Sequence, residues 1–188
     1  MLQLQIIIVS TRPGRVGVPV ADWFIERAER HGKFAIEVID LAKVALPLFD
    51  EPRHPRLRQY EHEHTKAWSR TIEPADAFVF VTPEYNFGAP PSLVNALDFL
   101  VHEWAYKPCA FVSYGGVSGG IRAVQMAKLI VTALKMMPMF EGVVLPFFAQ
   151  QIDKEKGVFT PPKVQDDAAV TMLDELLKWA TALKSMRQ

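Results

Sequence analysis

Cysteine is almost absent from this sequence. Cys109 is the only cysteine among the 188 residues, which excludes an internal disulfide and any zinc or iron–sulfur site that several thiolates would hold. Cys109 also lies in an apolar run, where a thiol is far more often a small core residue than a nucleophile. We therefore expect no metal site and a reducing, cytoplasmic setting.

An excess of charge of either sign is also missing. Lysine plus arginine and aspartate plus glutamate number 21 each, so the net charge is zero and no overall basic field attracts nucleic acid or an anionic membrane. No segment approaches the roughly 18 apolar residues of a membrane span. Residues 1–9 show no basic leader and no cleavage-site pattern. We expect neither nucleic acid nor membrane as a partner, and the weak self-repulsion of a neutral chain permits oligomers.

Apolar runs and helical stripes alternate along the whole chain. The length and the 49% of hydrophobic residues are typical of one globular domain spanning residues 1–188. Short apolar runs predict strands, apolar stripes at helical spacing predict helices, and proline-rich or polar stretches predict loops. The expected strands are residues 4–9, 34–41, 76–82, 108–113 and 143–145, and the last of them can extend back to residue 139. The expected helices are residues 16–31, 60–72, 93–104, 121–135 and 169–183. The expected long loops are residues 43–59 and 153–162.

Strands that are apolar on both faces need helices on both sides of a parallel sheet. The alternation therefore predicts a three-layer, doubly wound α/β fold with five parallel strands. Right-handed crossovers leave few topologies, and the strand order 2-1-3-4-5 is the leading one. In such a sheet a ligand lies beyond the carboxyl ends of the strands, where the strand order reverses. This reasoning directs attention to the loops that follow strands one, three and four.

The first of these loops, residues 10–17 (STRPGRVG), brings two hydroxyls and two guanidiniums to the start of a helix. A phosphate fits that environment, because orphan backbone N–H groups and the helix dipole favour an anion and arginine binds one bidentately. The plainer alternative is that Ser10 or Thr11 caps the helix while the arginines lie in solvent. The loop has neither the Walker A lysine nor a G-x-G-x-x-G pattern.

The other two loops favour a flat ligand. Residues 83–90 (PEYNFGAP) offer aromatic faces, an amide and prolines that restrict the backbone, and residues 113–120 (SYGGVSGG) offer glycines that let a ligand approach the main chain closely. Each also has an ordinary interpretation as a turn into the next helix. Tyr85 in particular either contacts the substrate or packs within the protein.

Three further pairs of residues are candidates for a metal site, for hydrolase nucleophiles and for a subunit contact. His62 and His64 lie two apart on an expected helix, where they would point to different sides and lie in solvent rather than bind a metal. Ser113 and Ser118 lack the G-x-S-x-G elbow of a serine hydrolase. Trp23 and Phe99 fall off the apolar stripes of their helices. Either one alone is also explained as an isolated surface aromatic, but the two together predict burial against another subunit.

Taken together, the motifs resemble those of a known family. STRPGRVG, then PEYNFGAP with SLVNALDFL after it, then SYGGVSGGIRA are similar, in this order, to the signatures of the NADPH-dependent FMN reductase family, whose members have a flavodoxin-like fold. The resemblance extends from about residue 4 to residue 145. Departures are Val9, where many members have glycine, Val94, where many have lysine, and residues 87–89, where a small polar pattern is commoner.

The resemblance implies a set of residues around FMN. Those expected at its phosphate are Ser10, Arg12, Arg15, Val16 and Gly17; those along the isoalloxazine ring are Pro83, Glu84, Tyr85 and Asn86; those on the other side of the ring are Tyr114, Gly115 and Gly116.

The implied function is that of an NAD(P)H-dependent, FMN-containing oxidoreductase. Such an enzyme would reduce quinones, azo compounds or free flavin by ping-pong hydride transfer, with the chemistry on the flavin and no catalytic side chain. The family also implies a homodimer or homotetramer. Two alternatives stay open at this point: a flavodoxin-type FMN electron carrier that does not oxidise a nicotinamide, and a structural relative that has lost its cofactor.

Overall fold

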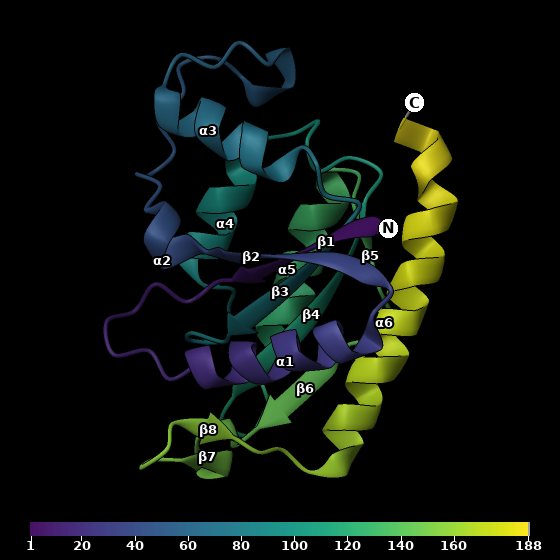
Figure 1. Cartoon of the computed structure of the whole chain (residues 1–188). Helices are drawn as coiled ribbons and strands as arrows, with labels where there is room; N and C mark the ends of the chain where they lie inside the picture. The colour runs from purple at the N-terminus through teal and green to yellow at the C-terminus, as the bar shows by residue number, and fades with distance from the viewer. Residues whose placement is uncertain (188) are drawn as a thin grey trace.

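The computed structural model describes residues 1–187 and centres on a parallel sheet (Figure 1). The strands run in the order β2-β1-β3-β4-β5, and β6 also pairs with β4. This confirms the α/β class, the order 2-1-3-4-5 and the flavodoxin-like fold. The strands of the sheet are β1 (Leu2–Ile8), β2 (Phe34–Asp40), β3 (Ala77–Pro83), β4 (Pro108–Gly115), β5 (Met137–Pro138) and β6 (Val143–Pro146).

Helices cover both faces of the sheet, because its central strands are apolar on both sides. In β1 the side chains of Leu4 and Ile6 enter one buried cluster, while Ile7 enters the other. Helices α1 (Val18–His31) and α6 (Lys163–Leu183) pack on the first of these clusters. Helices α3 (Glu63–Ile72), α4 (Pro91–Asp98) and α5 (Ile121–Ala133) pack on the second, on the opposite side of the sheet from α1 (Figure 1).

The expected fifth strand is divided in two. β5 pairs with the start of β4 and β6 with its end, and residues 139–142 separate them. Met137 and Met139 donate to the carbonyls of Lys107 and Cys109 at 3.1 and 2.8 Å, so Pro138, which lies between them, needs no N–H toward β4. The expected long loops also contain short elements: the helix α2 (Leu41–Val44), the 3₁₀ turn η1 (Pro55–Leu57) and a hairpin of β7 (Ile152–Asp153) and β8 (Val158–Phe159). α4 ends at Asp98, six residues earlier than the stripe predicted, and α6 begins at Lys163, six residues earlier than expected.

The expectation that Trp23 and Phe99 contact another subunit is wrong. Both side chains are buried within this chain. The Trp23 ring packs edge-on against Phe159 of the β7–β8 hairpin, with centroids 5.6 Å apart, and its Nε1 donates to an Asp166 oxygen at 3.0 Å. Phe99 follows the end of α4 and packs edge-on against Phe49 at 5.2 Å. A helical stripe cannot anticipate either contact, because both involve distant segments that the prediction treated as loops.

The two neighbouring histidines also differ from expectation. His62 precedes α3 in an extended conformation, so the rings of His62 and His64 do not diverge as helical neighbours would. They stack with centroids 5.1 Å apart, and both contact Asp50. Within residues 1–187 no group of three or more His, Cys, Asp or Glu side chains is placed to hold a metal ion. None of the helices in that range is long and apolar enough to cross a membrane.

Candidate functional site

A cleft of about 510 Å³ lies where the loops after β1, β3, β4 and β6 meet at the carboxyl edge of the sheet. Its volume is within the range of small-molecule sites. The structure brings together there all of the residues expected around FMN except Asn86, which is exposed and does not line the cleft. The lining residues are Ser10, Arg12, Gly14, Arg15, Val16, Gly17, Pro83, Glu84, Tyr85, Tyr114, Gly115, Gly116, Phe147, Phe148, Ala149 and Gln150.

The first loop leads into the amino end of α1 without a cap. Gly17 occupies the N-cap position, no side chain accepts a bond from the first N–H groups, and the first turn of α1 has no acidic residue. These N–H groups and the helix dipole therefore favour an anion. The Arg12 side chain is exposed. Its guanidinium makes no hydrogen bond or ion pair with any other residue in the range 1–187. Arg12 is thus the cation that this loop can offer to a ligand.

Arg15 has a different environment. Its Nη1 and Nη2 lie 2.6 and 2.5 Å from the two carboxylate oxygens of Asp40, at the end of β2, and Nη1 also donates to the Ser10 carbonyl. The hydrogen bonds from Arg15 lower the pKa of Asp40, although burial opposes the shift. Most of the Arg15 charge is therefore balanced within the chain. The pair joins the loop to β2 and holds its shape.

Two tyrosines form the floor between the loops. The Tyr85 hydroxyl lies 2.9 Å from Ser10 Oγ, which connects the second loop to the first. Tyr114 is buried, burial raises its pKa, and its hydroxyl packs against Gly17. A Cβ at Gly17 would lie 1.9 Å from that hydroxyl oxygen, so a larger residue there would force the buried Tyr114 side chain to move. Tyr85 thus has a partner within the chain and also lines the cleft, so its geometry is compatible with both interpretations of this residue.

Glu84 connects the second loop to the third. Its side chain is 6% exposed. It accepts hydrogen bonds from Ser118 Oγ at 3.0 Å, from the Arg122 backbone N–H at 3.1 Å and from Arg122 Nε at 2.7 Å. The bonds from Arg122 and Ser118 lower the pKa of Glu84 even though burial acts in the opposite direction. Glu84 is therefore an ionised connection between loops, whose backbone rather than carboxylate is available to a ligand.

Sequence reasoning missed the wall that follows β6. Phe147 and Phe148 line the cleft, and the Phe148 ring lies 4.7 Å from that of Tyr114. The Phe147 N–H donates to the Gly116 carbonyl at 3.1 Å, which places this segment beside the third loop. The signal was present in the sequence, because two aromatic residues directly follow the last strand, at the edge where ligands bind.

The cleft combines a cationic end with a flat, largely apolar one. Arg12 and the amino end of α1 suit a phosphate, and tyrosine, phenylalanine and glycine backbone suit a planar ring. A Cβ at Gly116 would meet no atom of the chain within 4 Å, so the backbone there is open to a ligand. This donor set fits FMN. Cys109 is fully buried, and burial raises its pKa, which agrees with a core thiol rather than a nucleophile.

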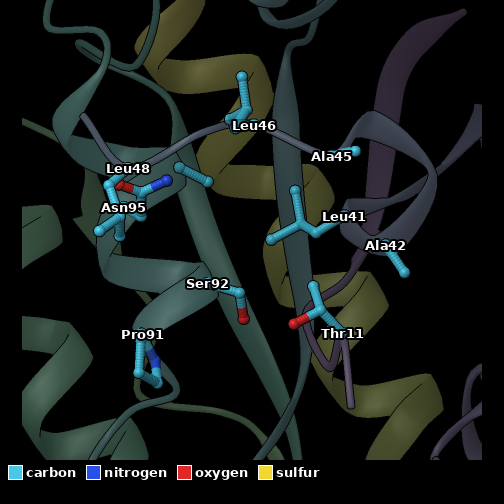
Figure 2. Close-up of a pocket in the computed structure, with 10 residues that line it drawn as sticks. Thr11, Leu41, Ala42, Ala45, Leu46, Leu48, Pro91, Ser92 and Asn95 are labelled. Atoms are coloured by element: carbon cyan, nitrogen blue, oxygen red, sulfur yellow. The ribbon is translucent and has the colours of Figure 1, made fainter. Parts of the chain in front are cut away.

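A second cavity, of about 390 Å³, lies beside α2 and the start of α4 (Figure 2). Thr11 contributes to it, while its neighbours Ser10 and Arg12 line the cleft. Its other polar side chains have partners within the chain: Ser92 Oγ donates to the Val9 carbonyl at 2.7 Å, and the Asn95 amide bonds to the backbone of residues 47 and 49. This cavity is mostly lined by leucine, alanine and proline and has no cationic end.

Comparison with known proteins agrees with these features. A model of the NADPH-dependent FMN reductase family matches residues 2–150. An NAD(P)H-dependent FMN reductase of Schizosaccharomyces pombe is 43% identical over 148 residues, 77% of this chain and 74% of that protein. An NADPH:quinone oxidoreductase of Arabidopsis thaliana is 33% identical over 117 residues, 60% of this chain and 54% of that protein. Among solved structures, a flavoenzyme NAD(P)H:(acceptor) oxidoreductase of Paracoccus denitrificans has the same fold, with a TM-score of 0.75 and 20% identity, covering 97% of this chain and 98% of that one. The chain therefore belongs to the NADPH-dependent FMN reductase family.

Proposed function

We propose that the chain is an oxidoreductase that binds FMN in the cleft and transfers hydride from NAD(P)H to small acceptors such as quinones. The observation that carries the proposal is the combination, in one cleft, of an uncapped helix N-terminus beside the exposed guanidinium of Arg12 with walls of aromatic side chains and glycine backbone. Family membership and the names of the relatives from S. pombe and A. thaliana support the same activity.

In this proposal the chain binds and orients rather than reacts. Arg12 and the first N–H groups of α1 hold the phosphate, with Ser10, Val16 and Gly17 beside it. The Arg15–Asp40 pair keeps the loop in position. Pro83, Glu84 and Tyr85 lie along one side of the ring, and Tyr114, Gly115 and Gly116 along the other. Bound FMN supplies the redox chemistry, with donor and acceptor reacting in turn at the same site. No acidic or nucleophilic side chain is required.

The test uses the purified full chain. An absorbance spectrum should show flavin, either as purified or after reconstitution with FMN. Initial rates with NADPH or NADH and a quinone should give parallel double-reciprocal lines, because the two substrates use one site in turn. Bound FMN with no oxidation of NADPH or NADH would indicate an electron carrier instead. A colourless protein that cannot be reconstituted would indicate a relative without cofactor.

We also propose that the chain forms a homodimer or homotetramer through α5. Ile121, Met126 and Leu129 are exposed apolar side chains on one side of this helix, with the exposed Arg122 and Gln125 between them, and Leu129 is 77% exposed. The absence of net charge permits close approach of two copies. Gel filtration at micromolar concentration should give at least twice the mass of the chain, and Leu129→Lys should shift it toward the monomer. A monomer mass for the unaltered protein would refute this proposal.

A further inference from the structure

Phe87 occupies a turn position that does not suit it. Tyr85 and Gly88 exchange both backbone hydrogen bonds, at 3.1 and 2.9 Å, so Asn86 and Phe87 form a two-residue hairpin turn. Both have positive φ angles, 48° and 68°, as a type I′ turn requires. Asparagine tolerates this conformation, but the second position strongly favours glycine. A phenylalanine there is strained, and such strain concentrates at functional sites.

Burial does not account for the phenylalanine. Its side chain is 69% exposed, so the core gains little from the ring. One face of the ring is covered by Arg122, whose guanidinium carbon lies 3.7 Å from the ring centroid. Arg122 is itself held by the buried carboxylate of Glu84. The ring is therefore fixed in orientation with its other face open.

The turn is continuous with the cleft. Glu84 and Tyr85, the residues just before it, line the cleft, while Phe87 itself lies outside the lining. The exposed ring therefore belongs to a turn that directly follows two lining residues of the cleft. An oriented aromatic face recognises another flat ring by offset stacking.

We propose that Phe87 is a specificity-determining residue, which stacks on planar aromatic acceptors such as bicyclic quinones while Arg122 and Glu84 hold its ring in place. The proposal rests on the proposed function and names a feature of its acceptor. A second copy of the chain covering the ring is the competing explanation, and the experiment below separates the two.

The experiment compares Phe87→Gly with the FMN-loaded unaltered protein. Glycine suits the turn and removes the ring. The KM for menadione, a bicyclic quinone, should rise about two- to tenfold, because that change in affinity corresponds to the free energy of one aromatic pair. The rate with ferricyanide, which has no flat face to stack, should not change. Calorimetric titration of menadione into the oxidised protein should show a matching loss of affinity. Phe87→Tyr, which keeps a ring, should restore both values.

Matched controls make the result interpretable. Phe140, whose ring is 93% exposed and does not line the cleft, provides a control in Phe140→Ala, which should leave the menadione KM unchanged. Without flavin, Phe87→Gly should melt at the same or a higher temperature than the unaltered chain, because the turn strain is relieved.

The outcomes are distinguishable from failure of the proposed function. Absence of FMN binding or of NAD(P)H oxidation in the unaltered protein would overturn the proposed function itself. If both are present, an unchanged menadione KM in Phe87→Gly would overturn the proposal that Phe87 stacks on the acceptor. Weaker FMN binding, or a smaller assembly on gel filtration with KM unchanged, would overturn it too, in favour of a cofactor contact or a subunit interface.

Discussion

The Nη1 and Nη2 atoms of Arg15 lie 2.6 and 2.5 Å from the two carboxylate oxygens of Asp40. The side chains of Arg15 and Asp40 are only 17% and 11% exposed. Arg15 belongs to the loop that opens the cleft, and Asp40 ends the neighbouring strand and also accepts from the Ala42 N–H at 3.0 Å. A bidentate pair of this kind is both directional and strong. It gives the two arginines of the first loop different roles, because Arg12 has no such partner within residues 1–187.

Replacing each arginine separately should reveal those roles. Arg12→Ala should weaken FMN binding about tenfold or more, since a charge-assisted hydrogen bond is worth about 1.5–3 kcal/mol. It should change the free energy of unfolding of the flavin-free chain by no more than about 0.5 kcal/mol, as for other surface substitutions. Arg15→Ala should lower that free energy by about 1–3 kcal/mol, because it leaves the Asp40 carboxylate unpaired. Fluorescence titration with FMN and urea unfolding measure the two effects. Equal loss of stability in both variants would contradict the division of roles.

The Arg15–Asp40 pair also predicts a dependence of stability on pH. The pKa of Asp40 is lower in the folded chain than its ordinary value, so its contribution is complete above the unfolded pKa of about 3.9 and declines as the pH falls below that value. The stability difference between the unaltered protein and Asp40→Asn should therefore be constant from pH 7 to pH 5 and shrink between pH 4 and pH 3. Urea unfolding at these pH values tests it. A difference that grows toward pH 3 would show the opposite sign of the shift.

Two glycines of the cleft should respond differently to alanine. At Gly17 the new Cβ would overlap the buried Tyr114 hydroxyl, so Gly17→Ala should reduce both the stability of the flavin-free chain and its affinity for FMN. Gly116→Ala meets no atom of the chain, so it should leave stability unchanged and weaken only FMN binding. Thermal melting without flavin and titration with FMN separate the effects. If Gly116→Ala left FMN affinity unaltered, the proposed position of the ring would be wrong.

Trp23 should behave as a core residue of a single chain. Trp23→Ala removes the contact with Phe159 and the hydrogen bond to Asp166, and should cost about 3–5 kcal/mol of unfolding free energy. It should leave the assembly state of the folded protein unchanged on gel filtration, in contrast to Leu129→Lys on α5. Dissociation by Trp23→Ala at full stability would reinstate this residue at a subunit contact.

Some of this architecture follows from local patterns alone. Apolar runs buried on both faces, as in residues 76–82, define the strands, and the alternation with helical stripes yields a parallel sheet in the order 2-1-3-4-5. The same rules direct attention to the carboxyl edge, where residues 10–17, 83–90 and 113–120 do meet. Strands and helices can be predicted from such patterns because hydrophobic periodicity depends on the backbone geometry of each segment and not on its partners.

What the patterns leave undetermined concerns partners that are distant in sequence. The pairing of Arg15 with Asp40, the burial of Trp23 under Phe159 and the contribution of residues 147–150 to the cleft all depend on how loops close over the finished sheet. Composition and periodicity along the chain determined the class of fold and the edge that binds a ligand. Only the tertiary structure decided which charges are already neutralised and which aromatic rings are covered, because both are set by long-range packing that no local period encodes.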